Sequence, residues 1–134
     1  MKSTSLVARA IVVALCATLA FGVSAQARSY NVGTALTLTG PKKINSGVAF
    51  TLRAKLESPR KFCIKDSDIW LYADGALVEM ETTGPKGWVI FAIEDGITSR
   101  TTYHAEFDGK VAGPHTDTKV CRSSSSNAVT VRIR

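Results

Sequence analysis

Apolar and polar residues alternate in short runs along the chain from residue 35 onward, and Gly, Pro, Asn, Asp and Ser separate the runs. In the run 48–56, Val48, Phe50 and Leu52 alternate with Ala49 and Thr51. A period of two is typical of strands, and no window of about a dozen residues holds the helical period. The chain is therefore predicted to be all-β, with strands at 35–39, 48–56, 69–72, 76–81, 88–93, 101–107 and 128–133.

The connections between these strands suggest how they are arranged. Asp74-Gly75 lies between two predicted strands and favours a hairpin, because this dipeptide readily adopts the positive φ of a tight turn. Residues 110–127 are polar and are predicted to form a long loop. Short strands separated by turns in this way are typical of a two-sheet antiparallel sandwich.

Residues 1–27 have the pattern of a secretory signal peptide. Lys2 and Arg9 give a positively charged start, an apolar run follows at 10–23, and Ala25-Gln26-Ala27 forms a small-x-small cleavage site. The apolar run of about 14 residues is shorter than the roughly 20 that span a bilayer, so no stable membrane anchor is expected. We therefore expect a signal peptide at 1–27 and a single bacterial domain at 28–134, exported to the periplasm or secreted.

Charge and cysteine content refine this picture. The chain has 17 Lys and Arg against 11 Asp and Glu, and without Lys2 and Arg9 the balance is 15 to 11, a net charge of +4. Export leaves Cys63 and Cys121 in an oxidising compartment, where an even pair is most simply one disulfide. A reactive thiol is the alternative, but neither cysteine belongs to a CxxC motif.

Six segments, taken in order, resemble the bacterial immunoglobulin-like (Ig-like) domains of surface and adhesin-type proteins. They are the run ending in Gly40-Pro41, then 46–52, 69–75, 87–91, 103–109 and 126–131. The resemblance implies an Ig-like two-sheet sandwich of about seven strands. It also implies a non-catalytic binding module that recognises a protein or mediates cell adhesion at the envelope or surface. Ala105 replaces the cysteine of the Tyr-x-Cys pattern of antibody domains, so the usual bridge between strands B and F is absent.

The resemblance also implies where the disulfide lies. Cys63 precedes strand C and Cys121 precedes strand G, so the bridge joins the B–C and F–G loops at one end of the sandwich. Loops at the end of a rigid scaffold commonly carry binding function. Candidate binding residues near the two cysteines are the cations Arg60, Lys61, Lys65 and Arg122, which suit an acidic protein or anionic polysaccharide. The alternative is that the bridge serves stability alone.

Trp70 and Tyr72 are further candidate binding residues, and the sequence leaves their orientation open. If Ile69 and Leu71 face the core, the two aromatic rings point outward and can stack on a sugar or anchor a protein. The opposite register buries Trp70 in the core. A carbohydrate-binding module that uses these rings is accordingly the second hypothesis.

No residue set points to catalysis. His115, Asp117 and the serines at 123–126 lack a nucleophile turn and an oxyanion loop, and two ligands do not make a metal site. We therefore expect no enzyme activity, no cofactor, no metal and no nucleic-acid partner. A structural envelope component, a secreted enzyme inhibitor and self-association through an exposed strand edge remain alternatives.

Overall fold

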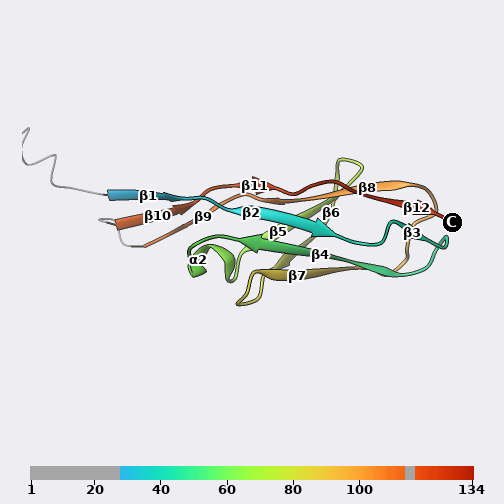
Figure 1. Ribbon diagram of the computed structural model, residues 1–134, viewed down its shortest axis with the longest axis horizontal. Helices are drawn as coiled ribbons and strands as arrows, with labels where there is room; N and C mark the ends of the chain where they lie inside the picture. The colour runs from blue at the N-terminus through green and yellow to red at the C-terminus, as the bar shows by residue number, and fades with distance from the viewer. Residues whose placement is uncertain (1–27, 114–116) are drawn as a thin grey trace, which may run out of the picture.

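The computed structural model describes residues 28–113 and 117–134. They form the short helix α2 (Lys61–Ile64) and a series of strands (Figure 1). The strands are β1 (Arg28–Val32), β2 (Ala35–Thr39), β3 (Lys43–Ile44), β4 (Phe50–Glu57), β5 (Asp68–Ala73), β6 (Ala76–Thr82), β7 (Trp88–Ile93), β8 (Thr101–Phe107), β9 (Lys110–Ala112), β10 (Asp117–Cys121), β11 (Ser124–Ser125) and β12 (Val129–Ile133).

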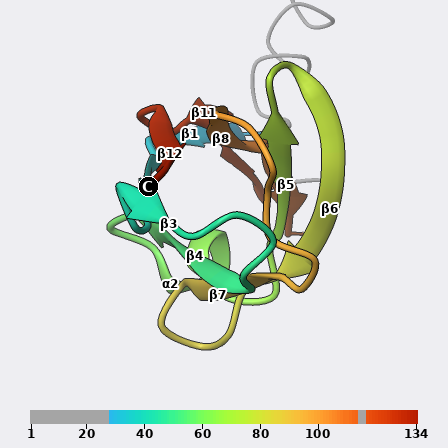
Figure 2. The same cartoon turned by 90° about the vertical axis from the view of Figure 1, so that its right-hand side faces the viewer.

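The described strands form three sheets, of which β1-β10-β9 is a small one and the other two face each other. One sheet has the order β2-β4-β7, and the other has the order β3-β12-β8-β5-β6, with β11 also paired to β8. Figure 2 looks along the length of the domain and shows β6 outside β5 in one layer and β7 beside β4 in the other. This arrangement confirms the predicted all-β, two-sheet sandwich.

The alternating pattern has the expected physical basis. In β4, Leu52, Ala54 and Leu56 are fully buried, while Thr51 and Arg53 between them are exposed. The same alternation in β8 buries Tyr103 and Ala105. Successive side chains of a strand point to opposite faces, so one face of each central strand enters the core.

A side chain from the connection between β11 and β12 joins the two sheets, where β2 lies near β8 and β11. The Asn127 amide accepts a hydrogen bond from the Leu38 backbone N–H at 3.0 Å and donates one to the Leu38 carbonyl at 2.9 Å. Asn127 thus bonds both backbone groups of one β2 residue as a neighbouring strand would. This contact satisfies polar groups of β2 that would otherwise lie unpaired beside the core.

The structure corrects two of the predicted boundaries. Residues 110–127, predicted as a loop, contain β9, β10 and β11; β10 pairs with β1 in parallel and with β9 in antiparallel orientation. Local pattern does not reveal these strands, because β1 lies almost ninety residues earlier in the chain (Arg28 pairs with Asp117). The strand predicted to begin at Val48 begins at Phe50, since the backbone first turns at Gly47, which has a φ of 73°.

Gly87 is required where the β6–β7 connection passes close to β4. Its φ is 85°, its carbonyl accepts a hydrogen bond from the Leu56 N–H at 2.9 Å, and an added Cβ would collide with the Leu56 carbonyl oxygen. Gly75 has a similar φ of 83°, but an added Cβ there meets nothing within 4 Å. The two glycines therefore separate the cost of a left-handed backbone from the cost of a steric collision.

We expect Gly87→Ala to lower the free energy of unfolding by about 2–3 kcal/mol and Gly75→Ala by about 1 kcal/mol. Chemical denaturation of the two variants measures this difference. Equal losses would show that the backbone near Leu56 moves to accommodate the methyl group.

Candidate functional site

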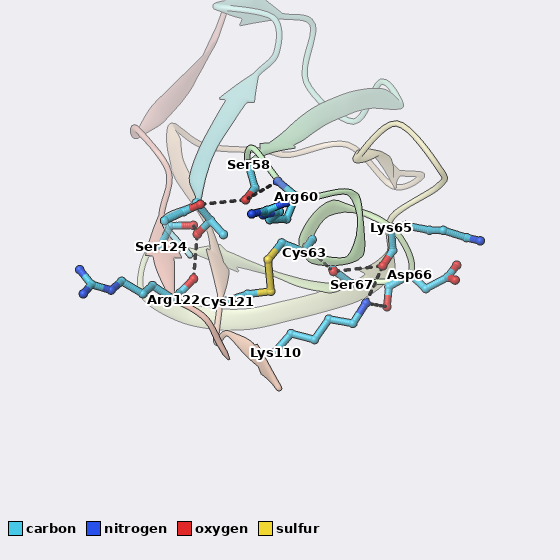
Figure 3. Close-up of a disulfide and its surroundings, with 12 residues drawn as sticks. Ser58, Arg60, Cys63, Lys65, Asp66, Ser67, Lys110, Cys121, Arg122 and Ser124 are labelled. Carbon is cyan, nitrogen blue, oxygen red and sulfur yellow. Dashed lines mark hydrogen bonds between the residues drawn. A yellow bond between two sulfur atoms is a disulfide. The ribbon is translucent and has the colours of Figure 1, made fainter. Parts of the chain in front are cut away.

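The disulfide lies at one end of the sandwich and joins two connections that are far apart in sequence. Cys63 in α2 and Cys121 at the end of β10 have Cα atoms 5.6 Å apart, and both side chains are buried (Figure 3). The bridge confirms the predicted pairing. It ties the segment between β4 and β5 to the segment between β8 and β12, at the end that Figure 1 shows opposite the C-terminus.

Two buried hydroxyl groups hold α2 in place. The Ser67 hydroxyl donates to the Cys63 carbonyl at 2.7 Å, and the Thr83 hydroxyl donates to the Ile64 carbonyl at 2.6 Å while accepting the Ser67 N–H at 2.9 Å. Both residues are almost completely buried. The end of α2 is therefore bonded to the connection that follows β6, and the sequence carried no local signal for this pair.

The segment between β1 and β2 is bonded to the same end. The Thr34 hydroxyl donates to the Arg122 carbonyl at 2.8 Å and lies 2.9 Å from the Ser124 hydroxyl. The Ser58 hydroxyl donates to the Gly33 carbonyl at 2.9 Å. Together with the disulfide, these bonds hold three separate segments of the chain as one unit.

A cleft of about 610 Å³ opens between these segments. Its lining residues are Tyr30, Asn31, Val32, Gly33, Pro59, Arg60, Phe62 and Lys119. Tyr30 is 47% exposed and Phe62 is half-buried, and the Lys119 ammonium lies 5.7 Å from the centre of the Phe62 ring. The cleft thus combines two aromatic side chains with the positive charges of Arg60 and Lys119.

The predicted cations are distributed unequally around this cleft. Arg60 lines it, whereas Lys61, Lys65 and Arg122 are exposed at the same end and do not line it. Figure 3 shows the Arg122 and Lys65 side chains extending in opposite directions, away from the disulfide. Sequence reasoning missed Tyr30, Phe62 and Lys119, because they lie on β1, α2 and β10, none of which was predicted.

Arg53 and Lys55 precede Arg60, Lys61 and Lys65 in a basic stretch at 53–65, but they belong to a different surface. Arg53 and Lys55 project from the outer face of β4 over the Trp88 ring, at 4.6 and 5.0 Å from its centre. Lys55 also forms a 3.3 Å ion pair with Glu57. The stretch is therefore not one continuous patch, because alternate residues of β4 and the following connection face different directions.

The open question about Trp70 and Tyr72 has a clear structural answer. Ile69 and Leu71 are fully buried, so Trp70 and Tyr72 lie on the outer face of β5, where both are half-buried. Trp70 borders a hollow of about 360 Å³ whose lining also includes Asp68, Asp108 and Lys110. This hollow shares no lining residue with the cleft.

Neighbouring side chains already occupy much of the space around Tyr72. Its ring stacks on the His104 imidazole with centres 4.9 Å apart, and His104 Nε2 lies 3.4 Å from a Glu106 carboxylate oxygen. Partial burial, followed by the negative charges of Glu106 and Asp108, raises the pKa of the Tyr72 hydroxyl. Tyr72 is therefore packed as a member of an aromatic–carboxylate row.

Within residues 28–113 and 117–134, no three His, Cys, Asp or Glu residues are grouped to hold a metal ion. In the same part of the chain, no helix is long and apolar enough to cross a membrane. The predicted signal peptide at 1–27 and His115 lie outside the described residues.

No protein-family model matches the chain, and no curated protein matches it. Among solved structures, a CARDB domain from Pyrococcus furiosus determined by NMR has 14% sequence identity and a TM-score of 0.52, and covers 77% of this chain and 97% of its own. A crystal structure of that CARDB domain in complex with di-metal ions has 12% identity and a TM-score of 0.50, covering 77% and 96% of the two chains. With the strand order described above, these likenesses identify the fold as an Ig-like β-sandwich.

Proposed function

We propose that this protein is an exported, non-catalytic Ig-like recognition module that binds an acidic segment of a partner protein in the cleft at the disulfide end. The observation that carries the proposal is the composition of this cleft, in which Tyr30 and Phe62 lie beside Arg60 and Lys119. Aromatic and arginine side chains dominate the binding energy of protein interfaces. An acidic segment with an apolar or aromatic residue would match both properties of the cleft.

The charges of the cleft are available for a partner. Among the described side chains, no carboxylate lies within 4.0 Å of Arg60 or Lys119. Because the disulfide and the hydroxyl contacts of Thr34 and Ser58 hold the surrounding segments, little ordering is needed on binding. Such preorganisation raises affinity by reducing the entropy lost in the complex.

Export is inferred from the pattern of residues 1–27, and a buried disulfide fits an oxidising compartment. The metal ions of the Pyrococcus furiosus CARDB complex are not transferred to this chain, because its described residues offer no group of three metal ligands. The residues of the cleft therefore support a binding role without catalysis.

The direct test measures binding of the oxidised protein to immobilised poly-L-glutamate, which represents an acidic protein segment. We expect Arg60→Ala/Lys119→Ala to weaken binding by about tenfold to a hundredfold, since a hydrogen bond to a charged group contributes about 1.5–3 kcal/mol. Lys42→Ala/Lys43→Ala is the matched control, because it removes the same charge from exposed residues at the opposite end. The control is expected to bind within about twofold of the unmodified protein.

Equal losses of affinity in the two double variants would show that binding is only general charge attraction, which would contradict the proposal. Phe62→Ala is expected to weaken binding without changing the charge, which general attraction does not predict. Hyaluronate in place of poly-L-glutamate provides the comparison with an anionic polysaccharide, and tighter binding to hyaluronate would favour the carbohydrate hypothesis. In that case Trp70→Ala would identify whether the hollow beside β5 is the sugar site.

A further inference from the structure

β6 and β7 are two edge strands that lie close to each other along one side of the sandwich. β6 is the last strand of its sheet beyond β5, and β7 is the last strand of the other sheet beyond β4 (Figure 2). No strand among the described residues pairs with the outer edge of either. Edge strands of this kind present free backbone N–H and C=O groups that can bind a further strand.

Exposed apolar side chains make the β6 edge unusual. Leu77, Val78 and Met80 are 55%, 49% and 41% exposed within one strand, and Ile90 on β7 is 57% exposed. Proteins commonly protect a sheet edge by keeping the edge strand short, or by placing a proline, a β-bulge or charged residues on it. β6 has seven residues and no proline, but its register with β5 shifts between Leu77 and Glu79, and Glu79 and Glu81 are charged. Leu77, Val78 and Met80 are nevertheless exposed on this edge strand.

A groove of about 680 Å³ lies between the two edges and is acidic. The register pairs Glu79 with Leu71 and Glu81 with Ile69, and because these partners are fully buried, both glutamates project from the inner face of β6. The groove is lined by Val78, Glu79, Glu81, Ile90, Ala92, Ile93, Glu94, Asp95, Gly96 and Tyr103.

The negative charges in this groove are close enough to affect one another. Burial, then a hydrogen bond with Glu81 and the charges of Glu81 and Glu94, raises the pKa of the Glu79 carboxyl. A cationic side chain placed over this row would relieve the repulsion. The groove is thus acidic on a chain whose net charge is positive.

We propose that the β6 edge and its groove bind an extended strand of a partner protein in which Lys or Arg alternates with apolar residues. Side chains of an added strand point alternately to the two faces of the sheet. The regular part of β6 runs from Glu79 to Thr82, beyond the register shift next to Leu77. Along this part the cationic side chains would face Glu79 and Glu81 over the groove, and the apolar ones would lie beside Met80 on the outer face. This site is separate from the cleft and does not depend on the function proposed for it.

A second copy of the chain fits this edge less well. Antiparallel pairing of β6 with β6 of another copy would place the glutamates of both strands together, and like charges on paired strands are destabilising. The opposite edge of the same sheet is β3, which has only two residues (Lys43–Ile44) and offers few backbone partners. A cationic strand from another protein therefore satisfies the groove better than self-association.

The test titrates the protein with the peptide acetyl-Lys-Val-Lys-Val-Lys-Val-amide, using calorimetry for affinity and amide hydrogen exchange by NMR for location. We expect increased protection of β6 amides, and an affinity about tenfold weaker in Glu79→Gln/Glu81→Gln. Glu57→Gln/Asp108→Asn, at exposed carboxylates away from the groove, is the matched control and is expected to bind within about twofold. Glu79→Lys/Glu81→Lys should instead prefer the corresponding Glu-Val peptide.

Several results would overturn the proposal. A peptide with the order Lys-Lys-Lys-Val-Val-Val that binds equally well would show that the strand period is not recognised. Protection outside β6 and β7, or equal losses in the control variant, would place the binding elsewhere. Absence of peptide binding would also overturn the proposal. If the protein alone sediments as a larger species at higher concentration, and Val78→Lys abolishes this change, the edge binds a second copy of the chain instead.

Discussion

Replacing Cys63 and Cys121 with alanine is expected to lower the free energy of unfolding by about 4 kcal/mol, because the bridge closes a long loop in the unfolded chain. The two cysteines are 58 positions apart and both are buried. In a domain whose total stability is typically about 5–15 kcal/mol, this is a large fraction. Guanidinium denaturation of the oxidised protein and of Cys63→Ala/Cys121→Ala measures the difference.

The location of the loss distinguishes a local from a global role for the bridge. Hydrogen exchange is expected to accelerate most in α2 and β10, which the bridge joins, while β4 and β8 retain their protection. The same variant should lose affinity for poly-L-glutamate, because Phe62 and Lys119 lie on the two bridged segments. A stability loss below about 1 kcal/mol would contradict the loop-closure explanation. Unchanged poly-L-glutamate binding would show that the hydroxyl contacts alone maintain the cleft.

Phe91→Ala is expected to lower the free energy of unfolding by about 3–5 kcal/mol, since it removes a large side chain and leaves a cavity. Phe91 is fully buried and pairs with the buried Leu52 of β4. Ile90, the adjacent residue, points to the opposite face and is largely exposed. Ile90→Ala is therefore the matched control, with an expected loss below about 1 kcal/mol.

Urea denaturation of both variants provides the measurement. The dependence of the free energy of unfolding on urea concentration should be similar in both variants if their unfolded states are alike. A loss for Ile90→Ala as large as that for Phe91→Ala would mean that β7 does not have the register observed here. Such a result would also undermine the β6–β7 groove, because its lining depends on that register.

Local pattern predicted the sandwich strands well where one face is buried and the other is exposed. The ranges 35–39, 88–93 and 101–107 coincide with β2, β7 and β8. In these strands the alternation of apolar and polar residues indicates which side chains enter the core. This pattern is visible in the sequence even when the neighbouring strands of the sheet are unknown. The cysteine pairing was predictable for a different reason, because the predicted domain at 28–134 contains only two cysteines and hence allows one intramolecular bridge.

The candidate site was only partly predictable. Arg60 was identified as a cation close to Cys63 in sequence, but Tyr30 and Lys119 lie on β1 and β10, whose parallel pairing is visible only in the structure. The buried hydroxyls of Ser67 and Thr83 likewise have ordinary sequence neighbours. Their role depends on backbone carbonyls that the fold brings within hydrogen-bond distance.

The sequence by itself determined the all-β class, the alternation of core and surface positions in the central strands, and the disulfide. These properties depend on side chains close in sequence or on the count of one residue type. Only the tertiary structure decided that Trp70 faces outward, that the cleft combines aromatic rings with two cations, and that Glu79 and Glu81 face a groove beside an open edge. Strand register and sheet order arise from pairing between distant segments, so no local pattern contains them.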